Sequence, residues 1–349
     1  MRKKKDPKVP VEKWEEDLDK IVHDLAKAQK PHRLPVIGDI FRAAAKLAME
    51  SPGTLNLKIT ATTIKELRFS FKTFYPHRHR PKITMFGSAR VPPKTPLYDF
   101  AKDFAKQAAS RNWMIITGGG PGIMAAGNEG AEEKSGFGLN IRLPFEQEHN
   151  PFVDDENMLI HYKYFFTRKL FLVKEATAFA FFPGGFGTFD EAFEVLTLLQ
   201  TGKSNLIPVV MVEPKGGGFW KAFTDFMYGA VLSHGFISEA DKSLYRVYDN
   251  AKDALDHIEH FYSTYHSMRF VRDRAVVRLK KTLKPELIKQ LNEKFGFLAK
   301  GGEMKMSAPL AEEGNEPELE KLPRLVFPFD RRDYGNLRAF IDFINDHAI

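Results

Sequence analysis

The sequence contains no cysteine among its 349 residues. Disulfide bonds, zinc–thiolate sites and thiol nucleophiles are therefore excluded, and this composition suits a reducing cytoplasm, where we expect the protein to work. The chain also has no apolar run of the ~18 residues that a membrane-spanning helix needs. The basic segment Met1–Pro10 is not followed by the apolar stretch of a secretory signal. We expect no membrane association.

Two common nucleotide-binding signatures are absent as well. A dinucleotide fingerprint that began at Gly118 and Gly120 would need a third glycine where Ile123 stands. The segment Gly202-Lys203-Ser204 imitates the end of a Walker A loop, but the first glycine of that loop would fall on Thr197, and a helical pattern precedes it instead of a strand. These absences disfavour a kinase, an ATPase and a hydride-transfer enzyme.

The charge is moderately basic, with 52 Lys and Arg against 45 Asp and Glu and a net charge of +7. Such an excess favours anionic partners, and a nucleotide would suit it. Outside the first ten residues and Pro76–Lys82, basic and acidic residues are interspersed, and no nucleic-acid-binding motif accompanies them. We do not expect nucleic acid as a partner.

The length corresponds to roughly two domains of ~150 residues each, and the pattern divides the chain into three regions. Residues 1–80 are predicted to be mainly helical, because apolar residues recur at helical spacing at Trp14, Leu18, Ile21 and Leu25. The basic, proline-bracketed segment Tyr75–Pro81 predicts a boundary. His77 and His79 lie in this segment without local partners, so we interpret them as part of a solvated linker.

Residues 81–266 alternate short apolar runs with helical patterns, which is typical of an α/β fold with a parallel sheet covered on both faces. The predicted strands are Ile83–Phe86, Trp113–Thr117, Gly138–Leu143, Met158–His161, Thr177–Phe182, Leu206–Val212 and Tyr245–Tyr248. The predicted helices are Tyr98–Arg111, Ile123–Lys134, Thr167–Ala176, Thr188–Thr201 and Trp220–Leu232.

Residues 267–349 change character and predict a small α+β appendage. The expected elements are a strand over Phe270–Leu279, a helix over Leu287–Phe295, a strand over Arg324–Phe329 and a final helix over Leu337–Ile344. Ala308–Pro323 is rich in Glu and Pro and is expected to be an exposed, mobile loop. Regulation, subunit contact and a packing role are all compatible with this region.

Three glycine-bearing turns follow predicted strands: Gly87-Ser88-Ala89-Arg90, Gly118–Gly122 and Pro183–Thr188. In an open α/β sheet, ligands bind at the carboxyl ends of the strands, where such turns converge. The third turn leads from a strand into a helix, so its amides lie at the positive end of the helix dipole and suit a phosphate. The predicted phosphate-binding residues are Gly87, Ser88, Gly119, Gly120, Gly184, Gly185, Gly187 and Thr188.

Glu191 follows the third turn and has two interpretations. It places a carboxylate beside whatever is attached to the phosphate. Thr188-x-x-Glu191 is also the pattern of a capping box, in which the glutamate reaches back to the amide of the first residue. Arg168 also has two interpretations. It is either an exposed residue at a helix start or, because a cation is unfavourable at that end of a helix, a sign of a nearby anion.

Other polar residues point to no metal site. Asp154-Asp155-Glu156 are three adjacent acids in a predicted loop, which is usually a solvated arrangement. His149, His161 and His234 lack partners at ligand spacing and are assigned core or surface roles.

Taken together, these motifs resemble the Lonely Guy (LOG) family of nucleotide phosphoribohydrolases, long labelled lysine-decarboxylase-like. Pro183–Glu191 matches the family's PGGxGTxxE, and Thr167-Arg168-Lys169 stands where the family usually has Ser-Arg-Lys. Further similarity lies in Phe86–Arg90, Gly118–Met124, Leu143–Gln147 and Asn150-Pro151, the last two resembling the longer bacterial branch. The resemblance runs from about Lys82 to Tyr262.

The resemblance implies a Rossmann-like fold and cleavage of a nucleoside 5′-monophosphate, such as AMP, into free base and ribose 5-phosphate. It implies that Arg168 and Glu191 are the catalytic pair, that no metal or cofactor is needed, and that the chain forms a homo-oligomer, at least a dimer. A decarboxylase would need pyridoxal phosphate and a Schiff-base lysine, which nothing in the sequence marks. The alternative function is a non-catalytic carrier of a nucleotide or phosphorylated cofactor, since related folds carry the molybdenum cofactor.

Overall fold

The computed structural model describes residues 11–26, 33–50, 53–132, 135–142, 149–153, 158–314 and 317–348. The chain forms two compact units, residues 1–68 and residues 69–349. Leu143–Gln147 and Asp154-Asp155-Glu156 lie outside the described residues. In the part of the chain that is described, no helix is both long and apolar enough to cross a membrane.

The first unit is helical, as predicted. It contains α1 (Val11–Ala26), α2 (Leu34–Met49) and most of α3 (Thr54–Phe74). Helices α1 and α2 pack together, and Arg42 of α2 reaches Asp19 of α1 at 3.4 Å and Asp39 one turn away at 3.0 Å.

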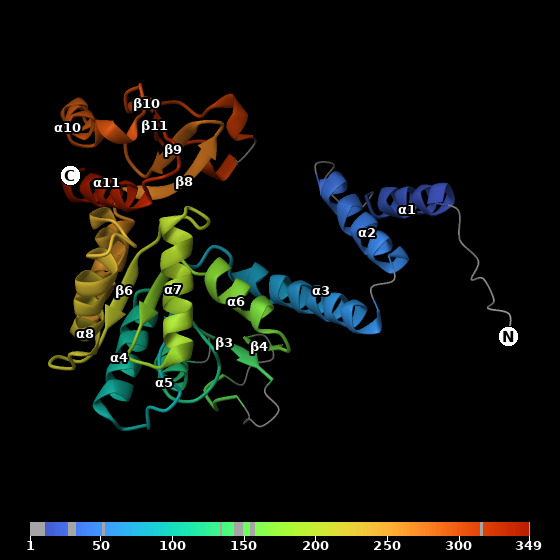
Figure 1. Ribbon diagram of the computed structural model, residues 1–349, viewed down its shortest axis with the longest axis horizontal. Coiled ribbons are helices and arrows are strands. Elements are labelled where there is room, and N and C mark those ends of the chain that lie inside the picture. The colour runs from blue at the N-terminus through green and yellow to red at the C-terminus, as the bar shows by residue number, and fades with distance from the viewer. Residues whose placement is uncertain are drawn as a thin grey trace. The chain divides into compact units, whose positions relative to one another are not determined.

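The second unit is built on a seven-stranded parallel sheet with the order β4-β3-β2-β1-β5-β6-β7 (Figure 1), which confirms the predicted α/β, Rossmann-like fold class. The strands are β1 (Lys82–Phe86), β2 (Met114–Thr117), β3 (Gly136–Ile141), β4 (Leu159–Tyr162), β5 (Ala178–Phe181), β6 (Val209–Val212) and β7 (Arg246–Tyr248). From β1 the chain proceeds outward to β4, then returns to place β5 on the other side of β1. The switch in direction therefore lies between β1 and β5, and parallel sheets of this kind bind ligands at such a point.

Alternation along β1 shows how the sheet is covered. Ile83 and Met85 belong to a buried core that includes residues of α4 (Pro96–Ser110), α5 (Ile123–Ala131) and α9 (Ala251–Phe261). Thr84 points to the opposite face, where its hydroxyl donates to the carbonyl of Leu172 in α6 (Phe165–Lys174) at 2.8 Å. Both faces of the sheet are therefore covered by helices.

Two further helices complete the α/β core. Helix α7 (Phe186–Gln200) follows β5, and its end is marked by Gly202, whose φ of 66° is left-handed. Glycine adopts that conformation without strain, so the chain leaves the helix there. Helix α8 (Phe219–Phe226) continues as a π-helical segment, Met227–Leu232, so the predicted single helix changes its hydrogen-bonding pattern within its length.

The C-terminal part forms a second sheet with the order β10-β11-β9-β8 and two helices. Its elements are β8 (Tyr265–Val271), β9 (Arg274–Leu279), α10 (Pro285–Phe295), β10 (Lys305–Ser307), β11 (Arg324–Pro328) and α11 (Tyr334–His347). The single strand predicted over Phe270–Leu279 is wrong. The chain reverses at Arg272, which has a positive φ of 56°, and β8 and β9 pair antiparallel as a hairpin.

The predicted exposed loop over Ala308–Pro323 is also wrong in part. Two short 3₁₀ turns form at Ala311–Glu313 and Pro317–Leu319. Glu313 is only 5% exposed, because Arg278 of β9 and Arg324 of β11 hold its carboxylate. Glu313 therefore has a structural role, which the glutamate-rich composition of the segment did not indicate.

Candidate active site

The turns that follow β1 and β5 lie side by side at the switch point. These strands pair in parallel, so their carboxyl ends coincide, and the amide of Ser88 donates to the carbonyl of Pro183 at 3.1 Å. At Gly184 a Cβ atom would lie 2.8 Å from the Ser88 nitrogen and 2.1 Å from Oγ1 of Thr188. Only glycine permits this close approach, which locks the two turns together.

Helix α7 begins at this junction. Gly185 is its N-cap and makes no side-chain capping bond, while the amides of Thr188 and Phe189 donate to the carbonyl of Gly185. The helix thus starts at Phe186, two residues before the predicted start, and Thr188 stands inside its first turn. The capping-box interpretation of Thr188 and Glu191 is therefore wrong. The first turn presents its amides and the positive end of the dipole without a capping side chain.

A cavity of about 740 Å³ opens at this helix end. The predicted residues that line it are Gly87, Ser88, Arg168, Gly185, Gly187, Thr188 and Glu191. Gly184 lies beneath the turn, at its contact with Ser88. The two predicted catalytic side chains, Arg168 and Glu191, therefore share one cavity with the amide-bearing turn.

Gly119 and Gly120 do not line this cavity. The Gly119 amide donates to Oγ1 of Thr117 at 3.0 Å, and the Gly119 carbonyl accepts from the amide of Asn150. The Gly120 carbonyl accepts from the side chain of Asn150, which also donates to buried Asn128. These polar contacts hold the loop in shape. Gly118 is the glycine of this turn that lines the cavity.

Arg168 is half-buried and held by two main-chain carbonyls, one in β3 and one in the turn directly after β2. Its Nε donates to Leu139 at 2.7 Å and its Nη2 to Gly118 at 3.3 Å. A Cβ atom at Gly118 would lie 2.2 Å from this Nη2. The interpretation as an exposed helix-start residue is therefore wrong. The guanidinium charge is fixed at the edge of the cavity.

Glu191 is 7% exposed. Among the described residues, no hydrogen-bond partner reaches its Oε2, although that atom is buried. Burial raises the pKa of the Glu191 carboxyl to about 7; Lys169 and Arg168 lower it, whereas Glu194 and Asp190 raise it. A buried carboxylate oxygen without a donor is costly unless a ligand supplies one. The residue is therefore suited to contact a ligand and to change its protonation state near neutral pH.

Lys169 is a functional candidate that sequence reasoning did not select. Its ammonium lies 2.9 Å from Asp190, 2.6 Å from Glu194 and 4.0 Å from Oε1 of Glu191. Burial alone would lower its pKa, but the hydrogen bonds to Glu194 and Asp190 raise it overall. In the sequence, its position directly after Arg168 could have identified Lys169 as a candidate. Lys169 therefore offsets the negative charge of three carboxylates on α7, of which Asp190 and Glu191 line the cavity.

The histidines form no ligand set with the acids. In the described part of the chain, no group of three or more His, Asp and Glu side chains could hold a metal ion. His149 and His161 do come together, with ring centroids 6.0 Å apart. Burial and nearby Arg142 lower the pKa of His161.

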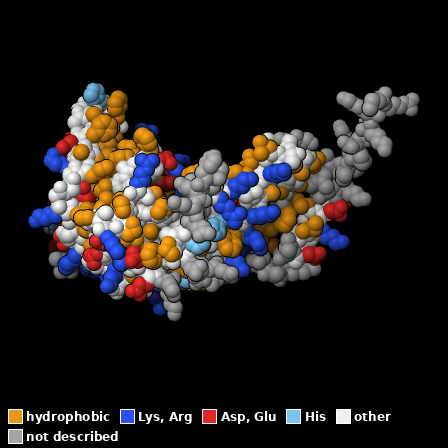
Figure 2. Space-filling view, turned by 90° about the horizontal axis from the view of Figure 1, so that it is seen from below, with side chains coloured by type: hydrophobic (Ala, Val, Ile, Leu, Met, Phe, Trp, Pro, Cys, Tyr) orange, Lys and Arg blue, Asp and Glu red, His pale blue; other side chains and the backbone are white. Residues whose placement is uncertain are grey.

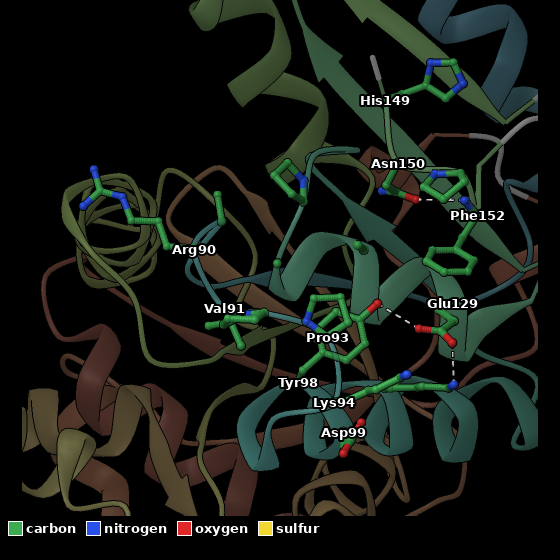
Figure 3. A pocket seen from close by; sticks show the side chains of 17 residues that line it. Arg90, Val91, Pro93, Lys94, Tyr98, Asp99, Glu129, His149, Asn150 and Phe152 are labelled. Carbon is green, nitrogen blue, oxygen red and sulfur yellow. Dashed lines mark hydrogen bonds and ion pairs between the residues drawn. The ribbon is translucent and has the colours of Figure 1, made fainter. Parts of the chain in front are cut away.

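A second, larger cavity of about 960 Å³ adjoins the first, and Ala89 and Arg90 line both. Figure 3 shows Glu129 on its wall, hydrogen-bonded by the Tyr98 hydroxyl at 2.8 Å and by Lys102 at 2.5 Å. The remaining walls are largely apolar, with Val91, Pro93 and Phe152 among them. Arg168 and Glu191 do not line this second cavity, so the predicted chemistry belongs to the smaller one.

Known proteins are similar to this chain in the region that carries the motifs. A family model described as "Possible lysine decarboxylase" matches residues 124–258. A cytokinin riboside 5′-monophosphate phosphoribohydrolase of Mycobacterium tuberculosis is 30% identical over 169 residues, which cover 48% of this chain and 88% of that protein. The Arabidopsis thaliana enzyme of the same name, LOG2, is 27% identical over 52% of this chain and 83% of its own length. Among solved structures, the molybdenum cofactor carrier protein of Chlamydomonas reinhardtii is 22% identical, with a TM-score of 0.36 over 52% of this chain and 97% of that one.

Proposed function

Because this chain belongs to the Lonely Guy family of phosphoribohydrolases, we propose that it hydrolyses the N-glycosidic bond of a nucleoside 5′-monophosphate, such as AMP. The products are the free base and ribose 5-phosphate. The observation that carries the proposal is the cavity at the start of α7, which is lined by Arg168 and Glu191 and opens at a helix terminus without a side-chain cap. The buried Oε2 of Glu191 has no hydrogen-bond partner among the described residues.

The phosphate of the substrate binds at the first turn of α7. The amides of Gly185 and Gly187 and the hydroxyl of Thr188 surround the cavity there, and the helix dipole favours an anion at that end. Binding energy from the phosphate, which is remote from the reacting bond, then positions the ribose against Glu191.

Glu191 acts on the ribose. Cleavage of a glycosidic bond develops positive charge on the sugar, and an ionised carboxylate in a site shielded from water stabilises that charge. The same carboxylate accepts hydrogen bonds from ribose hydroxyls or orients the attacking water. Arg168, held by two carbonyls, either binds the phosphate or assists the departing base. Arg168→Lys and Arg168→Ala separate these roles by their effects on KM and kcat.

Decarboxylation is the weaker assignment for this site. Among the described residues, no lysine lines the cavity that holds Arg168 and Glu191. The lysine closest in sequence, Lys169, is committed to Asp190 and Glu194. A Schiff base would need a lysine amine open to a carbonyl ligand.

The test is release of free base from a panel of purine and pyrimidine 5′-monophosphates, followed by chromatography. We expect turnover with at least one of them and its loss in Glu191→Gln with an unchanged circular dichroism spectrum. Failure of every monophosphate to yield base overturns the proposal. Tight AMP binding without base release, unaffected by Glu191→Gln, would instead indicate the carrier function.

We also propose that the chain is a homo-oligomer, at least a dimer. Support comes from large hydrophobic side chains on helices α6 and α7 that are exposed, with Phe165 and Phe166 each at 54% and Phe193 at 42%. Hydrophobic side chains are visible between the charged ones on the face of the molecule in Figure 2. Sedimentation of a monomer at all concentrations would refute this assembly.

The remaining expectations also stand as proposals. We propose that the chain is divided into a helical region over residues 1–80, a catalytic part over residues 81–266 and an appendage over residues 267–349. We place the activity in the cytoplasm, whose reducing conditions suit a sequence without cysteine.

A further inference from the structure

Arg90 lies in the turn that follows β1, and the main chain of this turn is held on both sides. The amide of Ser88 donates to Pro183, and the carbonyl of Ser88 accepts from the amide of Ile123 at 3.0 Å. A Cβ atom at Gly122 would lie 2.3 Å from the same carbonyl oxygen, so glycine is needed there for the turns after β1 and β2 to meet. The main chain that carries Arg90 is therefore fixed at the edge of the cavity at the start of α7.

The Arg90 side chain, in contrast, is exposed. Among the described residues, none forms a hydrogen bond or an ion pair with its guanidinium, and only its main-chain amide is engaged, by Oγ of Ser88 at 3.1 Å. Arg90 lines the second cavity as well as the cavity at the start of α7. Figure 3 shows its side chain directed away from Glu129 and Phe152 of the second cavity. The five guanidinium donors of Arg90 are therefore available to a ligand.

The strand order separates Arg90 from Arg168. Because β1 pairs with β5, the turn that carries Arg90 lies beside the turn that leads into α7. The carbonyls that hold Arg168 belong to Gly118, after β2, and to Leu139, in β3. These strands are one and two positions farther from β5 than β1 is. Arg90 is therefore attached next to the first turn of α7, whereas the guanidinium of Arg168 is held on the side of β2 and β3.

The first turn of α7 needs a further positive charge if it is to hold a phosphate. The helix dipole supplies about half a positive charge, whereas a phosphate monoester carries about −1.5 to −2 at pH 7. Asp190 and Glu191 of the same helix also line the cavity and repel an anion when they are ionised. Two donors of Arg168, its Nε and Nη2, already serve main-chain carbonyls. Of the two arginines that line the cavity, Arg90 is the one whose guanidinium donors are not used by the described residues.

We propose that Arg90 binds the phosphate of the substrate together with the first turn of α7. Arginine holds phosphate through paired charge-assisted hydrogen bonds, which need a guanidinium that can turn to meet the phosphate oxygens. Arg90 meets this requirement because its main chain is fixed and its side chain is not engaged. The assignment rests on the proposed hydrolysis, and it leaves Arg168, held by two carbonyls, to assist the departing base.

The experiment uses the full chain with Glu191→Gln as the background, so that no ligand is consumed. Calorimetry measures the binding of AMP and of ribose 5-phosphate, and adenosine is measured as a competitor of AMP. The variants added to this background are Arg90→Ala and Arg90→Lys. The matched control is Lys94→Ala, which removes an exposed cation of the same segment that lines the second cavity and not the cavity at the start of α7.

We expect Arg90→Ala to bind AMP and ribose 5-phosphate at least about tenfold more weakly, because both ligands carry the phosphate. Adenosine lacks the phosphate, so its affinity should be the same in Arg90→Ala as in the background. Arg90→Lys keeps the charge without the paired geometry and should recover only part of the loss. Lys94→Ala should bind all three ligands like the background.

Equal affinity of Arg90→Ala and the background for ribose 5-phosphate overturns the assignment. An equal loss for adenosine also overturns it, because the substitution would then have changed the shape of the cavity. An equal loss in Lys94→Ala overturns it as well, since any positive charge on this surface would then suffice.

These measurements do not need turnover. If the unaltered chain hydrolyses no monophosphate but Arg90→Ala still binds the phosphorylated ligands more weakly, the proposed hydrolysis fails and Arg90 stands as a phosphate ligand. If hydrolysis is observed and Arg90→Ala binds both phosphorylated ligands like the background, the assignment of Arg90 alone fails.

Discussion

The ammonium nitrogen of Lys169 lies 4.0 Å from Oε1 of Glu191, while the same ammonium is within 3 Å of both Asp190 and Glu194. The lysine is thus too far from Glu191 to donate a hydrogen bond but close enough to lower its pKa. The effect of burial is larger than that of this attraction, so the pKa of the Glu191 carboxyl is raised to about 7. A small change in the charges around Glu191 therefore changes how much of this carboxyl is ionised near pH 7.

The first prediction concerns the pH dependence of hydrolysis. With a pKa of about 7 for Glu191, and with the ionised form as the active one, kcat/KM should rise as pH increases from 6 to 8. The measurement is initial base release from AMP across this range. A rate that falls over the same interval would mean that the protonated carboxyl is the active form and that Glu191 works as a general acid.

The second prediction separates the stability of the fold from its activity. The folded pKa of Glu191 is raised above the ordinary value of 4.5, so its charge destabilises the fold as pH rises above 4.5, with the full cost above pH 7. Glu191→Gln removes the charge and should stabilise the inactive protein, by up to about 3 kcal/mol at pH 8. Urea unfolding at pH 8 and pH 5 checks this. Equal effects at the two pH values would contradict it.

The third prediction tests Lys169 as a positioning residue. Lys169→Met leaves Asp190, Glu191 and Glu194 without their shared cation, so the pKa of Glu191 should rise and the acidic limb of the pH–rate profile should move up by roughly one unit. Lys169→Arg keeps the charge and should restore most of the wild-type profile. If both variants lose activity equally at every pH, Lys169 has a structural role only.

The strands and the fold class were predictable because short apolar runs between glycine-bearing turns are a local signal. The environment of Arg168 was not, because its carbonyl partners at Leu139 and Gly118 follow from the pairing of strands that are distant in sequence. The start of α7 was misplaced for a related reason. Thr188-x-x-Glu191 fits a local capping pattern, but Gly185 takes the cap position when the turn closes on Ser88.

The C-terminal errors have a similar origin. At the tip of the β8–β9 hairpin, Arg272 takes a positive φ without the glycine or asparagine that usually marks such a turn. Burial of Glu313 depends on two arginines that lie 35 and 11 residues away. The composition of a segment predicts the average exposure of its residues. It does not predict the burial of a single residue that forms an ion pair with residues distant in sequence.

The fourth prediction concerns the junction of the two turns. Gly184→Ala would place a methyl group 2.8 Å from the Ser88 nitrogen and 2.1 Å from Oγ1 of Thr188, so it should destabilise the fold by about 1–3 kcal/mol and abolish hydrolysis. Gly185→Ala is the matched control, because nothing lies within 4 Å of a Cβ atom there. Thermal unfolding of the pair measures the difference. Equal melting temperatures would show that the turn can widen without cost.

The last prediction concerns the buried ion cluster of the C-terminal sheet. Glu313→Gln removes the buried carboxylate charge that Arg278 and Arg324 share, so it should cost about 3–5 kcal/mol of unfolding free energy at pH 7. Glu312→Gln is a matched control at the neighbouring position, since Glu312 is partly exposed and its partners Arg272 and Arg274 lie 3.7 and 3.5 Å away. It should cost less than about 1 kcal/mol.

The pH dependence of the same cluster gives a second readout. Burial opposes ionisation of Glu313, but the Leu310 amide and the two guanidinium groups lower its pKa overall, below the ordinary 4.5. Its stabilising contribution is therefore complete above pH 4.5 and declines as acid titrates the folded carboxylate. The difference in unfolding free energy between wild type and Glu313→Gln should accordingly shrink below pH 4.5. A difference that stays constant down to pH 3 would mean that shape, not charge, holds the 3₁₀ turn in place.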